Sequence, residues 1–379
     1  MQNIISNISK LKMNTICHKI ATTDFICKYN NNKLYDCFYA MIASHIVKSD
    51  KMHMFTYGLV CDDVIYKKME LLLSINENKY TKSVVLSYCS NARGTIYADV
   101  YNLSDSIQVL KSKKTKSYFL CINDDYYYII SEKLLNEINY SVDGYKYFEH
   151  ILSKYETAND SILFHGAALV KKQKGILIVG PKRSGKTTLW LDLMDKFDFA
   201  SLSVDKTFLK VNNSHISMYG FPTRIRALAG TLLKYGDTFK QLIPYEYCNA
   251  PAEILWKGES AGKVDIPYDY IKRQYLSADI NVDIKLKAIV IPEISMNNTQ
   301  SINIASKTAI NDIVIPQIFS PYNPEEDWWS KVGKDRVQKI QCNKDKLIEK
   351  LNNIPIYHIS GSENLDDSLS RFTNIIEQL

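Results

Sequence analysis

The sequence predicts an α/β protein in two parts, residues 1–155 and residues 156–379. After residue 155, short and fully apolar runs alternate with segments of helical periodicity, a pattern typical of strands buried on both faces of a sheet. Before residue 155, tyrosine-rich runs are joined by turn residues, which favours hairpins beside a few helices. We therefore expect an α+β N-terminal domain followed by an α/β domain.

The composition is that of a folded globular protein. The 379 residues are 46% apolar and 23% charged, which is enough apolar material for a core in each part. The net charge of +6 suits a polyanionic small ligand, and no strongly basic run indicates a nucleic-acid partner.

The cysteines and the apolar runs bear on the compartment. The eight cysteines form no C-x-x-C pair, so we expect free thiols in a reducing cytoplasm rather than zinc ligands or disulfides. No apolar run approaches the ~20 residues of a membrane helix, and residues 1–6 lack the apolar core of a signal peptide. We expect a cytoplasmic protein without a membrane partner.

In the N-terminal part the patterns predict one helix and three strands. Asp36 to Val47 is expected to be helical because its apolar residues fall on one face. Gly94 to Tyr101 is a candidate strand. Tyr118 to Ile122 and Tyr126 to Ile130 flank Asn123-Asp124-Asp125, the pattern of a β-hairpin.

In the C-terminal part the patterns predict alternating strands and helices. The expected strands are Ile162 to Val170, Gly175 to Val179, Phe199 to Val204, Phe208 to Val211, Ile216 to Tyr219, Leu286 to Ile291 and Ile354 to Ile359. The expected helical segments are Lys186 to Phe197, Ala227 to Leu242 and Asn364 to Leu379.

A phosphate-binding loop lies between the second of these strands and the first helix. Residues 180–187 match G-x-x-x-x-G-K-[ST] in full. The glycines let backbone N–H groups point at phosphate oxygens, and the following helix directs its positive end at the same oxygens. The chemistry predicts a nucleoside triphosphate, ATP or GTP, with Lys186 on the β- and γ-phosphates and Thr187 on Mg²⁺. The expected nucleotide-binding residues are Gly180, Pro181, Lys182, Arg183, Ser184, Gly185, Lys186, Thr187 and Thr188.

Two further residues are candidates for catalysis. Asp205 ends a strand that we expect beside the P-loop strand, where its carboxylate can accept a proton from an alcohol and serve as a ligand to Mg²⁺. The alternative for Asp205 is an acid that caps a hairpin turn. His165 lies in an otherwise apolar run, so the alternative for it is a satisfied core histidine.

Basic residues after residue 220 are candidates for the acceptor substrate. Arg224 and Arg226 follow a Pro-Thr turn and point the same way if the segment is extended, so they are candidates to bind an anionic substrate, as is Lys263. Solvated basic side chains are the alternative. Glu293 follows a buried strand as a Walker B acid does, but Pro292 argues against that role.

Several segments together resemble the HPr kinase-like group of P-loop proteins. These are His165-Gly166-Ala167-Ala168-Leu169 before the P-loop, Ser203-Val204-Asp205 after the helix, Gly220 to Arg226, Lys263, and Ala288 to Pro292. The resemblance covers about residues 160–295. It implies phosphoryl transfer to a hydroxyl, with His165 beside the transferred phosphate and Asp205 as the base. The chain departs from the pattern at Val204, where the resemblance implies a first acid.

Three functions remain open at this stage. The first is a kinase whose acceptor is a small molecule, a natural-product intermediate or a peptide serine, with the N-terminal domain selecting it; the resemblance also implies a link to biosynthesis and a possible homo-oligomer. The second is a non-catalytic nucleotide-binding module that controls a partner. The third is a nucleotide hydrolase, or a phosphorylase that runs the same chemistry in reverse.

Overall fold

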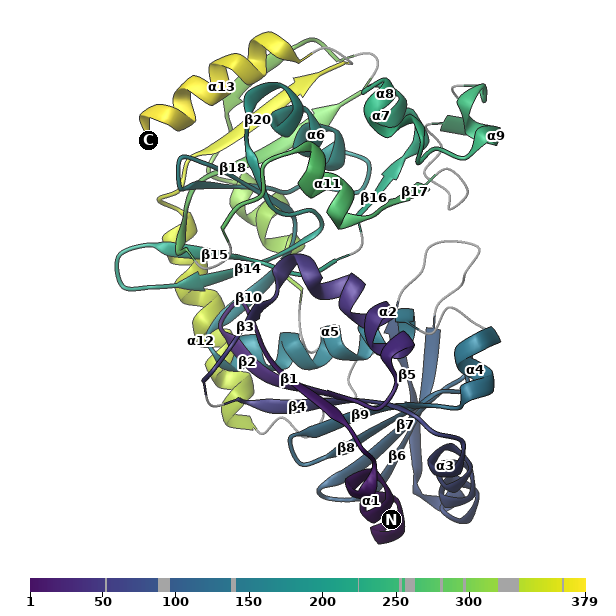
Figure 1. Ribbon diagram of the computed structural model, residues 1–379. Coiled ribbons are helices and arrows are strands. Elements are labelled where there is room, and N and C mark those ends of the chain that lie inside the picture. The colour runs from purple at the N-terminus through teal and green to yellow at the C-terminus, as the bar shows by residue number, and fades with distance from the viewer. Residues whose placement is uncertain are drawn as a thin grey trace. The chain divides into compact units, whose positions relative to one another are not determined.

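The computed structural model (Figure 1) describes residues 1–51, 53–87, 96–137, 141–223, 225–251, 254–255, 263–279, 282–295, 298–319, 334–362 and 365–379. Its contacts divide the chain into an N-terminal unit built on Met1–Asn159 and a C-terminal unit built on Asp160–Ser320 and Lys334–Leu379. Each unit contains a large mixed sheet with helices, so the α/β class is confirmed.

The sheet of the N-terminal unit has the order β3-β1-β2-β4-β9-β8-β7-β6-β5. Parallel pairing joins β2, β4 and β9, whereas the other neighbours run antiparallel. The strands are β1 (Asn14–Ile20), β2 (Thr23–Tyr29), β3 (Val47–Lys48), β4 (Phe55–Cys61), β5 (Tyr80–Ser87), β6 (Ile96–Ser104), β7 (Ile107–Ser112), β8 (Tyr118–Ile122) and β9 (Asp125–Ile130). The predicted hairpin is confirmed as β8 and β9, and the described part of the predicted strand over 94–101 lies in β6.

The helices of the N-terminal unit are α1 (Gln2–Lys10), α2 (Asn32–Ile42), α3 (Asp63–Ile75), α4 (Glu132–Glu137) and α5 (Ser141–Ala158). The predicted helix over 36–47 is α2, but it begins and ends earlier. Asn31 caps it by accepting a hydrogen bond from Leu34 N at 3.0 Å, and a 3₁₀ turn over Ala43–His45 follows it.

The sheet of the C-terminal unit has the order β10-β14-β15-β18-β12-β11-β13, with β20 pairing both β18 and β19. The P-loop strand β12 is parallel to β18 and antiparallel to β11. The strands are β10 (Ser161–His165), β11 (Ala167–Lys171), β12 (Lys174–Ile178), β13 (Ala200–Ser203), β14 (Lys206–Val211), β15 (Ile216–Gly220), β18 (Ile284–Ile294), β19 (Ser301–Ile304) and β20 (Ile356–Gly361). A separate ribbon consists of β16 (Ile225–Leu228) and β17 (Lys263–Ile266).

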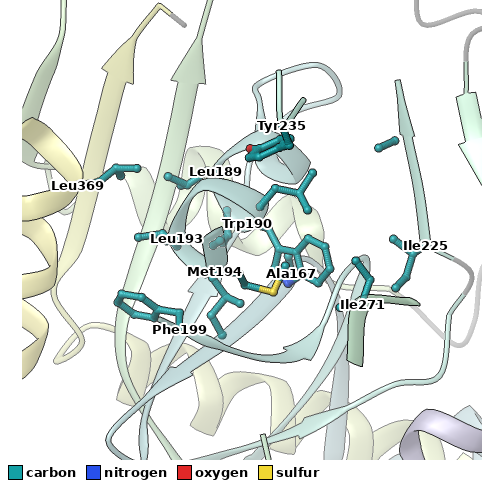
Figure 2. Packing of buried hydrophobic residues seen from close by; sticks show 14 of the residues in the cluster. Ala167, Leu189, Trp190, Leu193, Met194, Phe199, Ile225, Tyr235, Ile271 and Leu369 are labelled. Atoms are coloured by element: carbon teal, nitrogen blue, oxygen red, sulfur yellow. The ribbon is translucent and has the colours of Figure 1, made fainter. Parts of the chain in front are cut away.

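The helices of the C-terminal unit are α6 (Lys186–Phe197), α7 (Ala229–Leu233), α8 (Asp237–Lys240), α9 (Tyr245–Cys248), α11 (Tyr268–Gln274), α12 (Lys334–Leu351) and α13 (Asp366–Gln378). Helices α6 and α13 pack with Ile176 and Ile178 of β12 on one face of the sheet, and α12 packs with Leu177 on the other. Figure 2 shows Leu189 of α6 and Leu369 of α13 in the first of these clusters. Alternate residues of β12 are therefore buried on opposite faces, which explains why the run from Gly175 to Val179 is apolar throughout.

Two predicted elements of the C-terminal unit are wrong in detail. The strand predicted over 162–170 is divided at Gly166 into β10 and β11, which pair with different neighbours. A Cβ atom at Gly166 would lie 2.9 Å from the Ile178 carbonyl oxygen, so the chain passes too close to β12 for a side chain. The helix predicted over 227–242 begins as β16 and then forms α7 and α8, which are separated at Gly236 with φ 55°.

Candidate functional site

The candidate site lies at the carboxyl ends of strands β12 and β13 in the C-terminal sheet. We call this row of strand ends the site edge of the sheet. Ala167 pairs with Ile178, and Ala168 pairs with Ser203, so β11 lies between β12 and β13. The prediction that the strand before Asp205 neighbours the P-loop strand is therefore wrong by one position. Because β11 runs antiparallel to both, β12 and β13 end at the same edge, and that edge carries the residues that follow each strand.

Backbone geometry fixes the loop between β12 and α6. Gly185 has φ 96°, and a Cβ atom there would lie 2.7 Å from the Ile294 side chain. Gly180 has φ 154°, and a Cβ there would lie 2.8 Å from Ser184 Oγ. Ile294 N donates to Ser184 O at 3.0 Å, which attaches the loop to the end of β18. Backbone conformation thus favours glycine at both positions, and close approach to Ile294 adds to this requirement at Gly185.

The start of α6 offers hydrogen-bond donors to an anion. No side chain caps this helix, and its first N–H groups have no partner within the helix. Thr187 and Thr188 in this first turn are half-buried, whereas Pro181, Lys182 and Arg183 of the loop are exposed. The arrangement has the donors and the helix dipole that favour phosphate.

Lys186 lies over the loop that it follows. Its Nζ donates to Gly180 O at 2.8 Å and to Pro181 O at 3.0 Å. Burial lowers the pKa of Lys186, the charge of Asp205 opposes this effect, and the charge of Lys263 adds to it. The ammonium is therefore short of negative charge in the protein alone, which an anionic ligand would supply.

His165 and Asp205 meet at the same edge. His165 Nε2 lies 3.2 Å from Asp205 Oδ1, and the two side chains are 40% and 52% exposed. The alternative of a satisfied core histidine is wrong, because the imidazole is accessible to solvent. Its ring centre lies 5.8 Å from that of Phe319. This pair, which we call the His165–Asp205 pair, is open to a ligand.

The oxygen ligands near the loop fit Mg²⁺. Among the described residues, no three His, Cys, Asp or Glu side chains are grouped to hold a metal ion. Mg²⁺ bound with a nucleotide needs few protein ligands, because phosphate oxygens and water complete its octahedron. The Thr187 hydroxyl and the Asp205 carboxylate are hard oxygen donors of the required kind. Val204, at the position where the sequence resemblance implies a first acid, packs against the core that contains α6.

The β16–β17 ribbon presents two of the predicted basic residues. Arg226 pairs across the ribbon with Asp265, its Nε 3.3 Å from Oδ1, and Lys263 pairs with Leu228. The residues that alternate with Arg226 and Lys263 along the two strands are buried: Ile225, Ala227, Val264 and Ile266. Arg226 and Lys263 therefore lie on the face of the ribbon away from the core.

Charge links Lys263 to the loop. Partial desolvation lowers the pKa of Lys263, and the charges of Arg226, Lys182 and Arg183 lower it further, while Asp205 opposes them. Each of these groups is therefore within electrostatic range of Lys263, so the structure brings Lys263 near residues that are far from it in the sequence. Arg224 lies outside the described residues.

The contacts of two further residues, Lys206 and Glu293, were not anticipated from the sequence. Lys206, next to Asp205, places Nζ 5.2 Å from the Phe221 ring centre and 5.3 Å from that of Phe319. Its only signal in the sequence is its position beside Asp205. Glu293 lies 3.2 Å from His358 Nε2, Oε2 being the contacting oxygen, so its carboxylate is engaged across β18 and β20.

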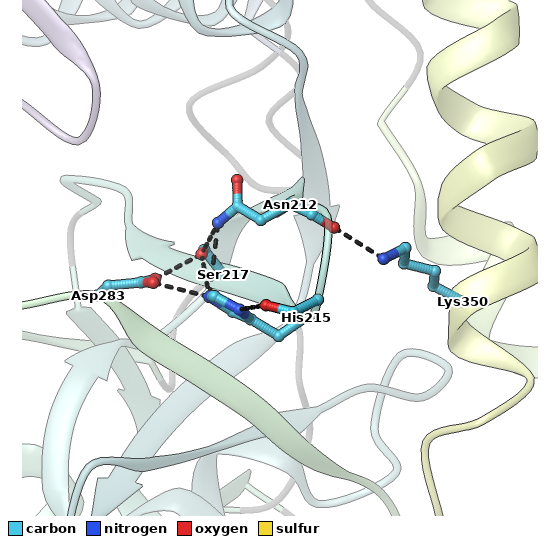
Figure 3. A network of polar contacts seen from close by, with 6 residues as sticks. Asn212, His215, Ser217, Asp283 and Lys350 are labelled. Atoms are coloured by element: carbon cyan, nitrogen blue, oxygen red, sulfur yellow. Dashed lines mark hydrogen bonds and ion pairs between the residues drawn. The ribbon is translucent and has the colours of Figure 1, made fainter.

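A Ser-His-Asp cluster lies at the opposite edge of the sheet (Figure 3). His215 Nε2 lies 2.7 Å from Asp283 Oδ2 and 3.2 Å from Ser217 Oγ, and Ser217 also donates to Asp283 Oδ1. An acyl-transfer triad uses the two ring nitrogens separately, one for the acid and one for the serine. In this cluster His215 Nε2 alone contacts both the acid and the serine, so the geometry is not that of a triad. The contacts instead connect the β14–β15 turn to the start of β18.

Comparison with known proteins gives no assignment. No protein-family model matches the chain, and no curated protein matches it at a significant level. Within the described part of the chain, no helix has the length and apolar character needed to cross a membrane.

Proposed function

We propose that the chain is a kinase of the HPr kinase-like type, which transfers the γ-phosphoryl group of ATP or GTP to an alcohol. The observation that carries the proposal is the His165–Asp205 pair, open at the sheet edge from which the P-loop departs. A loop of this kind positions a triphosphate, and a carboxylate at the same edge supplies the one group that alcohol phosphorylation further needs, a proton acceptor.

The residues divide the work of the reaction. Backbone N–H groups at the start of α6 and the ammonium of Lys186 hold the β- and γ-phosphates. Asp205 accepts the proton as the alcohol oxygen bonds to the γ-phosphorus, and the bond to the bridging oxygen breaks to release the nucleoside diphosphate. His165 holds Asp205 and lies beside the transferred group. Thr187 and Asp205 would hold Mg²⁺, which when bound neutralises charge on the phosphates.

The ribbon indicates the class of acceptor. Arg226 and Lys263 lie on the exposed face of β16–β17, and Lys263 is within electrostatic range of Asp205. An alcohol whose neighbouring carboxylate or phosphate contacts this face would place its hydroxyl toward Asp205. A small metabolite, a biosynthetic intermediate and an acidic peptide serine all have this chemistry, and we propose that the N-terminal unit selects among them.

One observation favours a second function, a non-catalytic nucleotide-binding module. Val204 packs against the core in place of an acid, so Asp205 is the carboxylate on which metal binding in this turn depends. A site with weakened metal binding would retain the nucleotide and could use it to order a partner-binding surface.

Labelled phosphoryl transfer distinguishes the two functions. The purified protein, Mg²⁺ and γ-labelled ATP or GTP are incubated with fractionated cell metabolites and with serine peptides. The matched variants are Asp205→Asn and Asp237→Asn, the latter removing a carboxylate that is 97% exposed on α8. The kinase predicts label on an acceptor with the wild type and Asp237→Asn but not with Asp205→Asn. Tight nucleotide binding without label in any of the three supports the module instead.

A further inference from the structure

Two buried hydroxyl groups lie behind the His165–Asp205 pair. Thr207 is fully buried in β14, and Ser203 is 1% exposed at the end of β13. Thr207 Oγ1 lies 2.9 Å from the Gly166 carbonyl oxygen and 2.5 Å from Ser203 Oγ. Gly166 follows His165, and Asp205 lies midway between Ser203 and Thr207 in the sequence, so this chain of hydrogen bonds connects the two segments that carry the pair.

The donors in this chain can be assigned. A carbonyl oxygen only accepts, so the Thr207 hydroxyl must donate its single proton to Gly166 O. Ser203 must then donate to Thr207. Each hydroxyl thus has one defined role, and the loss of Thr207 Oγ1 would leave both Gly166 O and the Ser203 hydroxyl without this partner in a buried place.

The hydrogen bond between Ser203 and Thr207 closes the turn that carries Asp205. Strands β10 and β13 stand at opposite ends of the strand order, and β10 continues into β11 through Gly166 alone. Among the described residues, no ladder joins β10 to β11 or β13 to β14. The β10–β14 ladder pairs His165 with Lys206, next to Asp205, and so brings the two residues together. This ladder does not include Asp205 itself or reach β13, whereas the hydroxyl chain connects Ser203, before Asp205, with Thr207 and with Gly166, the residue after His165.

We propose that Thr207, supported by Ser203, is a positioning residue that holds His165 and Asp205 in contact. The inference rests on the proposed kinase function for its catalytic consequence. A valine at position 207 would match the shape of threonine and suit a buried strand equally well, so packing and strand propensity do not account for the hydroxyl.

The test compares isosteric variants by a spectroscopic and a kinetic measurement. The Cε1–H NMR signal of His165, assigned by its loss in His165→Gln, is followed at constant pH. It should move in Asp205→Asn, which removes the partner charge. We expect the His165 signal of Thr207→Val to move part of the way toward its position in Asp205→Asn. The signal of Thr207→Ser, which keeps the hydroxyl, should stay at the wild-type position. Thr373→Val is the control, because the buried Thr373 Oγ1 in α13 has no hydrogen-bond partner.

The kinetic measurement tests the consequence for transfer. Thr207→Val should lower kcat about 10- to 100-fold while KM for the nucleotide changes less than about threefold, because only alignment is lost. Ser203→Ala is the milder variant and replaces Thr207→Val if that protein does not fold. It should also lower kcat while leaving KM for the nucleotide nearly unchanged. An unchanged His165 signal in both folded variants would overturn the proposal. A moved signal in a protein that transfers no phosphate would retain the positioning role and overturn the kinase function alone.

Discussion

His165 Nε2 lies 3.2 Å from Asp205 Oδ1, and His165 is paired in the β10–β14 ladder with Lys206, the residue after Asp205. The contact is possible because each residue lies at a junction where the chain leaves one part of the sheet for another. The β10–β14 ladder ends at His165 and Lys206, so it holds His165 beside the turn that carries Asp205. Asp205 itself lies between β13 and β14, outside that ladder.

Lys186→Ala should weaken ATP or GTP binding by at least about tenfold, because it removes the cation that would contact the β- and γ-phosphates. Burial lowers the pKa of Lys186, so its charged form is disfavoured in the folded protein alone. The melting temperature without nucleotide should therefore not fall. Titration calorimetry and thermal melting measure the two effects. Lys196→Ala, on the last turn of the same helix, should leave binding unchanged.

Gly185→Ala should abolish measurable nucleotide binding and cost about 1–3 kcal/mol of stability, because φ is 96° and the new Cβ would meet Ile294 at 2.7 Å. Gly236→Ala is the matched control. It too has a positive φ, 55°, but no atom lies within 4 Å of its new Cβ. Urea unfolding and nucleotide titration of both variants separate backbone strain from steric contact. Equal losses in the two would contradict our account of the loop.

The pH dependence of stability should reveal the Ser-His-Asp cluster at the other edge. Although burial raises the pKa of Asp283, hydrogen bonds from Ser217 and His215 bring it below its ordinary value of 3.8. A lowered folded-state pKa stabilises the protein above the ordinary pKa, and this contribution is lost as the pH falls below it.

Asp283→Asn should therefore reduce the free energy of unfolding near about pH 7 by ~1 kcal/mol, a modest value because the carboxylate is 44% exposed. The deficit should shrink toward about pH 3, as the wild-type carboxylate becomes protonated. Urea unfolding at the two pH values measures it. Asp237→Asn, which removes a carboxylate that is 97% exposed, should show no deficit at either pH. A deficit of Asp283→Asn that is independent of pH would point to lost packing rather than lost charge.

The local elements were predictable because their signals are local. Helix α6 has the bounds that periodicity predicted, Lys186–Phe197, since the motif fixes its start and Asp198, with φ 54°, ends it. The segment over 227–242 was not predictable in detail. Its apolar residues satisfy helical spacing, but Ile225 and Ala227 are buried by pairing with β17, a strand some forty residues later. Long-range pairing overrides periodicity in such short segments.

The site was predictable as a set of residues and not as a geometry. The sequence marks the loop and Asp205 by motif and by position after a strand. It does not show that β11 lies between β12 and β13, because strand order depends on pairings between distant segments. The role of Thr207 has no sequence signal at all, since a buried threonine in a strand is ordinary. Only its distance to Gly166 O distinguishes it.

Val204→Asp provides the sharpest test between a kinase and a nucleotide-binding module. It introduces a second carboxylate next to Asp205, and Val204→Asn is the matched control of the same shape without the charge. Both variants should lose about 1–3 kcal/mol of stability, because the side chain packs against the core.

If the site already performs transfer with one acid, Val204→Asp should leave transfer at or below the wild-type level and raise Mg²⁺ affinity modestly. If Val204 has instead disabled catalysis, Val204→Asp should create Mg²⁺-dependent transfer or hydrolysis that neither the wild type nor Val204→Asn shows. Nucleotide turnover against Mg²⁺ concentration measures the difference. New activity in the aspartate variant alone would assign the wild-type protein to the binding modules, because a single charge would then be all that separates it from catalysis.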